Sequence, residues 1–137
     1  MNVAFFLIPK AQVKYLYDNF TIRQALEKMR MHGYTAIPVL NDEGQYMGTV
    51  SEGDFLWHII GNKGECENTD MKSLEKELLK HVLVKEKNPP VNITTSVEDL
   101  LNQSLRQNFV SVVDDKGSFI GIVTRQDIIR YFVEHKN

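Results

Sequence analysis

The sequence of 137 residues has only one cysteine, Cys66, and no surplus of positive charge. A single cysteine cannot form a disulfide within the chain, and this usage is typical of a protein from a reducing compartment. Sixteen Lys and Arg residues stand against eighteen Asp and Glu residues, which gives a formal net charge of −2. This balance provides no positive field for phosphates, so the sequence argues against a nucleic-acid partner.

Long hydrophobic runs are also missing from the sequence. The apolar run 3–8, VAFFLI, is too short to cross a membrane and has no basic region in front of it. We therefore expect it to form a first β-strand packed against the core rather than a signal peptide. With no other candidate span, the sequence predicts a cytoplasmic protein without a membrane partner.

The residue types that usually carry catalysis are scattered. His32, His58, His81 and His135 show no paired spacing, and Cys66 lies alone in a polar segment. Acid-base and nucleophilic catalysis need such groups beside one another, and a metal site needs several of them at ligand spacing. The sequence therefore predicts neither catalytic residues nor a metal site.

One stretch of the sequence occurs twice. Residues 36–56, AIPVLNDEGQYMGTVSEGDFL, recur 73 positions later as residues 109–129, FVSVVDDKGSFIGIVTRQDII. Each copy has the pattern of a strand, a turn with Gly, a second strand and a helix that begins after Ser or Thr. The positions identical in both copies are Val39/Val112, Asp42/Asp115, Gly44/Gly117, Gly48/Gly121, Val50/Val123 and Asp54/Asp127.

The segments before each copy complete a β-α-β-β-α repeat. Thr21 and Ser96 are candidate N-caps of a preceding helix, of which the first should end at Gly33. We predict an α+β fold with strands at 36–40 and 46–50 and a helix at 52–60. Because halves of roughly 60–70 residues bury little apolar surface, we expect the two repeats to pack together.

These patterns predict domain boundaries along the chain. We assign one module to residues 1–137, with repeat 1 at 10–61, a linker at 62–88 and repeat 2 at 89–137. Within the linker, Leu74, Leu78 and Val82 follow helical spacing, with Asp70 as the candidate cap.

The helix starts at Ser51 and Thr124 are the candidate binding sites. A helix N-terminus offers unpaired N–H groups and a positive dipole to a phosphate, and Asp54 or Asp127 in the same turn can accept hydrogen bonds from a vicinal diol. The alternative is structural, because Ser/Thr-x-x-Asp is also an ordinary capping pattern that binds no ligand. The pattern alone leaves both interpretations open.

The ordered set of motifs, repeated in register, resembles a tandem pair of cystathionine-β-synthase (CBS) domains, with a helical linker between the repeats. This resemblance implies two repeats around a pseudo-two-fold axis, with two clefts that bind AMP, ADP, ATP, S-adenosylmethionine or a cyclic dinucleotide. It implies no other cofactor. Carried over to this chain, it implies that Asp54 and Asp127 hold ribose hydroxyls and that Ser51 and Thr124 approach the phosphate. The residues that would line the adenine slots are Ala36, Ile37, Pro38, Val110 and Ser111, with Thr94 at an adenine edge.

The two copies differ where a ligand would bind. Ser111 replaces Pro38, so one adenine slot loses a rigid wall, and Arg125 replaces Glu52 at the first helical position. Arginine offers a charge-assisted, bidentate partner to a phosphate, whereas a carboxylate repels it. We therefore expect the cleft with Thr124, Arg125 and Asp127 to be the better nucleotide site.

The helices at 52–60 and 125–134 carry apolar residues on more than one face, which predicts a homodimer through these helices. The resemblance favours a regulatory module that signals to an unknown effector protein in trans. The alternative is a ligand-free module for protein interaction or dimerisation.

Overall fold

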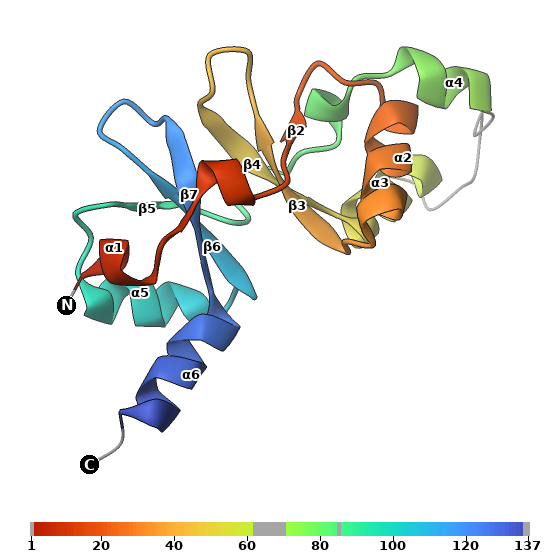
Figure 1. Cartoon of the computed structure of the whole chain (residues 1–137). Coiled ribbons are helices and arrows are strands. Elements are labelled where there is room, and N and C mark those ends of the chain that lie inside the picture. The colour runs from red at the N-terminus through yellow and green to blue at the C-terminus, as the bar shows by residue number, and fades with distance from the viewer. Residues whose placement is uncertain (1, 62–70, 85, 136–137) are drawn as a thin grey trace. The chain divides into compact units, whose positions relative to one another are not determined.

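The structure is a computed structural model that describes residues 2–61, 71–84 and 86–135 (Figure 1). Cys66 and Asp70, which the sequence places in the linker, lie outside the described residues. The chain divides into two compact units, and each is described by itself. The second-repeat unit comprises Met1–Lys14, Gly44–Tyr46 and Asn88–Asn137, and the first-repeat unit comprises Tyr15–Glu43 and Met47–Lys87.

The first-repeat unit contains the predicted elements. Its sheet has the strand order β2-β3-β4, with β2 (Leu16–Tyr17) parallel to β3 (Ala36–Leu40). The helices are α2 (Ile22–His32) and α3 (Glu52–Ile60), and β4 spans Tyr46–Ser51. The strands predicted at 36–40 and 46–50 and the helix predicted at 52–60 are confirmed.

Local signals explain the bounds of α2. Thr21 and Gln24 form a capping box, and Gly33 ends the helix in the left-handed conformation with φ of 70°. Between these ends, one face of the helix is buried. Together with the strands and α3 it forms a core of Leu16, Ile22, Ala25, Met29, Ile37, Val39, Val50, Phe55, Leu79 and Val82.

The single linker helix predicted from Leu74, Leu78 and Val82 is wrong. Helix α4 spans Met71–Lys76, and a separate 3-10 turn spans Leu79–His81. Between them, Leu78 is extended and forms an isolated bridge with Thr21, and the carbonyl of Glu77 accepts the N–H of Ile22. The linker backbone therefore satisfies the unpaired start of α2 instead of continuing its own helix.

The second-repeat unit has a four-stranded sheet in the order β1-β7-β6-β5. Strand β7 (Phe119–Thr124) is antiparallel to both β1 (Ile8–Pro9) and β6 (Phe109–Val113), whereas β5 (Val91–Asn92) is parallel to β6. Helices α5 (Val97–Ser104) and α6 (Arg125–Glu134) follow β5 and β7. As predicted, Ser96 caps α5 by accepting a hydrogen bond from the Asp99 N–H.

The N-terminal strand predicted at 3–8 is wrong. Residues Val3–Phe6 form the short helix α1, and only Ile8 and Pro9 are in a strand. Val3 and Phe6, three positions apart, are both buried in the core of this unit. A helical turn places such a pair on one face, whereas a strand would place them on opposite faces. Burial of both side chains therefore favours the helical turn.

A close backbone contact fixes β1 on the edge of this sheet. Pro9 lies opposite Gly121 of β7, and a Cβ atom added at Gly121 would lie 2.1 Å from the carbonyl oxygen of Ile8. Only glycine admits this approach without displacing the chain. Gly121 therefore holds the N-terminal segment against β7. Among the residues that the structure describes, no helix has the length and hydrophobicity needed to cross a membrane.

Candidate ligand site

The helix start at Ser51 is a complete capping box. The Ser51 hydroxyl accepts a hydrogen bond from the Asp54 N–H at 3.3 Å, and the Asp54 carboxylate accepts one from the Ser51 N–H at 2.9 Å. The other carboxylate oxygen accepts a hydrogen bond from Lys87 Nζ at 2.7 Å. Asp54 is buried, with 5% of its surface exposed. Both of its oxygens are therefore engaged within the protein.

The helix start at Thr124 differs. The Thr124 hydroxyl accepts a hydrogen bond from the Asp127 N–H at 3.1 Å. In the part of the chain that the structure describes, the Thr124 N–H does not donate to the Asp127 carboxylate, so the capping box is incomplete. The Asp127 side chain is 34% exposed, and its carboxylate lies 3.6 Å from the guanidinium of Arg130. Asp127 thus keeps a carboxylate that the cap does not use.

Arg125 is fixed beside this helix start. Its Nε donates a hydrogen bond of 2.8 Å to the carbonyl oxygen of Ser104, at the end of α5. A guanidinium has five N–H donors, so this bond positions the group and leaves capacity for an anion. Thr124, Arg125 and Asp127 are therefore brought together at the first turn of α6.

The other predicted site residues in this unit have different surroundings. Val110 is a core residue, and Ser111, next to it on β6, projects from the opposite face of the sheet. Ser111 is 1% exposed, and its hydroxyl has no hydrogen-bond partner among the described residues. Thr94 is tied into a turn, because its hydroxyl donates to the Asn92 side chain at 2.8 Å.

In the first-repeat unit, the predicted adenine-slot residues all belong to β3. Ile37 is part of the hydrophobic core, Pro38 is buried and Ala36 is partly buried. The structure therefore places these three residues on one strand of the unit whose helix start contains Ser51 and Asp54.

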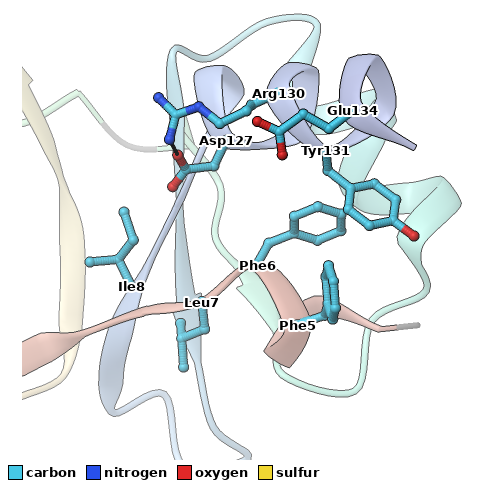
Figure 2. Close-up of a pocket in the computed structure, with 8 residues that line it drawn as sticks. All are labelled: Phe5, Phe6, Leu7, Ile8, Asp127, Arg130, Tyr131 and Glu134. Carbon is cyan, nitrogen blue, oxygen red and sulfur yellow. Dashed lines mark ion pairs between the residues drawn. The ribbon is translucent and has the colours of Figure 1, made fainter. Parts of the chain in front are cut away.

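A pocket of about 310 Å³ lies beside Asp127, within the second-repeat unit (Figure 2). Its N-terminal wall was not predicted from the sequence, because residues 3–8 were expected to form a strand in the core. The other wall was within reach, since Arg130 and Tyr131 follow Asp127 at helical i+3 and i+4 spacing. Lys87, the partner of Asp54, has no comparable sequence signal. The pocket is lined by Phe5, Phe6, Leu7, Ile8, Asp127, Arg130, Tyr131 and Glu134.

The side chains in the described ranges form no group of three or more His, Cys, Asp or Glu residues that could hold a metal ion. The chemistry available at the start of α6 is instead that of hydrogen bonding. It combines a hydroxyl, a guanidinium and a partly exposed carboxylate, which together suit a phosphorylated polyol, whereas the N–H groups of Arg125 and Asp127 already donate to Asn108 and Thr124.

Two α+β units, each with a Ser or Thr helix start followed by Asp, define a duplicated α+β module. A family model for the CBS domain matches residues 8–61 and 79–134. The chain belongs to the CBS domain family, which confirms the interpretation of the sequence repeats.

The similar proteins include an uncharacterized protein and a receptor for a cyclic dinucleotide. An uncharacterized protein of Methanopyrus kandleri is 28% identical over 103 residues, or 75% of this chain, which spans about half (49%) of that protein. The cyclic di-AMP receptor B of Bacillus subtilis is 25% identical over 135 residues, which cover 98% of this chain and 88% of the receptor. A hypothetical conserved protein of Geobacillus kaustophilus has a similar structure, with a TM-score of 0.85 and 27% identity over 98% of this chain and 97% of its own.

Proposed function

We propose that this chain is a non-catalytic regulatory module that binds an adenosine-containing ligand at the start of α6 and signals its presence to a partner protein. The observation that carries the proposal is the state of Asp127. At the equivalent position, Asp54 is buried and fully used by its capping box and Lys87. Asp127 is partly exposed and outside the capping motif, and its ion-pair partner Arg130 is itself exposed, so its carboxylate can also accept hydrogen bonds from ribose hydroxyls.

The proposed roles follow the order of groups along α6. Asp127 accepts hydrogen bonds from ribose, while the Thr124 hydroxyl, which accepts the Asp127 N–H, donates its own proton to the phosphate. Arg125, fixed by Ser104, adds a charge-assisted bond to the phosphate. The buried, unpartnered hydroxyl of Ser111 on the neighbouring strand β6 is available to the base, with Thr94 as a further predicted contact. Val110 can contribute only its backbone, because its side chain lies in the core on the other face of the sheet.

The start of α3 is the weaker of the two sites in this proposal. A ligand that binds Asp54 must displace Lys87 or break the capping box, and Glu52 stands where the other site has Arg125. An uncharged adenosyl group is the ligand that these residues would tolerate best. Its proposed contacts are Ser51, Asp54, Ala36, Ile37 and Pro38.

The candidate ligands are AMP, ADP, ATP, S-adenosylmethionine and a cyclic dinucleotide. The last is supported by the similarity to the Bacillus subtilis receptor. The ligands differ at Asp127 itself. AMP presents a vicinal ribose diol, whereas cyclic di-AMP keeps only the 2′-hydroxyl on each ribose because its phosphates link the 3′ and 5′ oxygens.

A thermal-shift panel of these ligands, with Asp127→Ala and Asp54→Ala alongside, tests the proposal. A ligand at a hundredfold excess over its dissociation constant stabilises the native state by about 2.7 kcal/mol. We expect at least one ligand to raise the melting temperature of the native sequence and of Asp54→Ala, with the rise lost in Asp127→Ala. A flat panel on folded protein would contradict the proposal.

The second candidate function is an interaction module without a ligand. It is favoured by large exposed apolar side chains on two helices, which contribute nothing to the core of their own unit. These side chains are Leu56 and Trp57 on α3, and Ile129, Phe132 and Val133 on α6, with exposed fractions from 46% to 72%. We propose that these helices form a homodimer interface, which is compatible with either function.

A further inference from the structure

The pocket beside Asp127, which we call the α1–α6 pocket, has two distinct walls. One is the N-terminal segment Phe5–Ile8, and the other is a single face of α6 that presents Asp127, Arg130, Tyr131 and Glu134 at i, i+3, i+4 and i+7 (Figure 2). All of its lining residues belong to the second-repeat unit. The pocket is therefore defined within one compact unit.

The N-terminal wall is anchored rather than loosely attached. The Tyr131 ring meets Phe5 and Phe6 edge to face, with centroids 5.1 and 5.5 Å apart. Phe6 is 6% exposed and belongs to the core, whereas Phe5 is 59% exposed. The buried ring holds the segment in place, and the exposed ring of Phe5 is available to a ligand.

The charges of the pocket select what it binds. Asp127 and Glu134 supply two carboxylates and Arg130 one guanidinium, so the lining carries a net charge of −1. A second phosphate beside Glu134 would be repelled, whereas a flat neutral or cationic ring can stack on Phe5 and Tyr131. Stacking of a base on an aromatic side chain strengthens binding by about fivefold or more.

The position of the pocket relates it to the proposed nucleotide site. Asp127 belongs to both, and Tyr131 lies four residues further along α6, a distance of about 6 Å at the usual helical rise. Thr124 and Arg125 lie on the other side of Asp127. In the proposed function the base of the nucleoside held by Asp127 lies at Ser111 on β6, which leaves the α1–α6 pocket for a second nucleoside.

We propose that the ligand of this chain is a dinucleotide, and that the ring of its second nucleoside stacks in the α1–α6 pocket. This inference rests on the proposed function and narrows its ligand class. AMP would leave the pocket unused. A second nucleoside would add ring stacking and compensate for the hydroxyl that a cyclic dinucleotide lacks at Asp127.

Isothermal titration calorimetry of the full chain with AMP, cyclic di-AMP and NAD tests this inference. Phe5→Ala removes an exposed ring of the pocket, and Tyr34→Ala removes an exposed aromatic ring that does not line it. We expect Phe5→Ala to weaken a dinucleotide at least about fivefold and to leave AMP unchanged. Tyr34→Ala should change neither affinity. Binding of cyclic di-AMP would identify the second ring as adenine, and binding of NAD alone would identify it as nicotinamide.

The outcomes separate this inference from the proposed function. If AMP binds through Asp127 as tightly as either dinucleotide, the dinucleotide inference is overturned while the proposed function stands. The same holds if Asp127→Ala abolishes dinucleotide binding but Phe5→Ala leaves its affinity unchanged. If no ligand in the panel binds, both the inference and the proposed function fail.

Discussion

At the scale of single residues, Asp54 and Asp127 occupy the same motif position in different surroundings. Both follow a Ser or Thr N-cap, but only Asp54 completes the capping box and pairs with Lys87. The sequence predicted the pair of aspartates and the difference between Glu52 and Arg125. It did not predict the state of either carboxylate, because Lys87 comes from a segment 33 residues away.

The Lys87–Asp54 pair gives the first stability prediction. The Asp54 side chain is 4% exposed and that of Lys87 is 43% exposed, so Lys87→Met leaves a buried carboxylate with one partner fewer. Allowing for the exposed end of the pair, we expect a loss of about 1–2 kcal/mol in the free energy of unfolding.

Urea unfolding measures this loss, and Lys80→Met is the control because the Lys80 side chain is exposed. Equal unfolding midpoints for the two variants would show that Lys87 does not stabilise Asp54.

At the scale of elements, the sequence predicted the helices that depend on local capping residues but not the elements that depend on tertiary contacts. Caps at Thr21, Ser51 and Thr124 are read from three or four adjacent residues, and their helices are where they were expected. The α1 turn and the break at Leu78 depend on partners distant in sequence. Periodicity within a short segment does not contain that information.

The contact of β1 with β7 gives the prediction at this scale. Gly121→Ala would place a Cβ atom 2.1 Å from the Ile8 carbonyl oxygen, whereas the same change at Gly48 meets its nearest neighbour, Leu83 Cδ2, at 3.4 Å. The two glycines have similar φ angles of 155° and 150°, so backbone strain is common to both. We expect Gly121→Ala to cost about 1–3 kcal/mol more than Gly48→Ala.

Because the strand β1 leads directly from the wall of the α1–α6 pocket, displacement of β1 should also expose residues 3–9. Hydrogen exchange of that segment, measured for both variants, tests whether displacement of β1 causes the loss of stability. Equal protection in Gly121→Ala and Gly48→Ala would contradict the role assigned to Gly121.

At the scale of the whole molecule, the proposed homodimer is the remaining prediction. Trp57 is 72% exposed on α3 and Ile129 is 55% exposed on α6, although both are apolar. We expect sedimentation to give a dimer mass at micromolar concentration, and Trp57→Glu or Ile129→Glu to shift the chain toward the monomer. A monomer mass independent of concentration would refute the dimer.

The family and the order of elements within each repeat were predictable from the sequence because the strand-turn-strand-helix block recurs in register. The α1–α6 pocket was not, because it combines Phe5 from the start of the chain with Tyr131 from the end. Its aromatic contacts exist only after the N-terminal segment has packed on α6.

The most direct test of the account is calorimetric titration of the native chain, Asp127→Ala and Asp54→Ala with the adenosine-containing ligand that gives the largest thermal shift. We expect binding to the native chain and to Asp54→Ala, with affinity lowered at least about tenfold in Asp127→Ala because charged hydrogen bonds to ribose are lost. Equal affinity in all three proteins would show that Asp127 only caps α6 and does not bind the ligand.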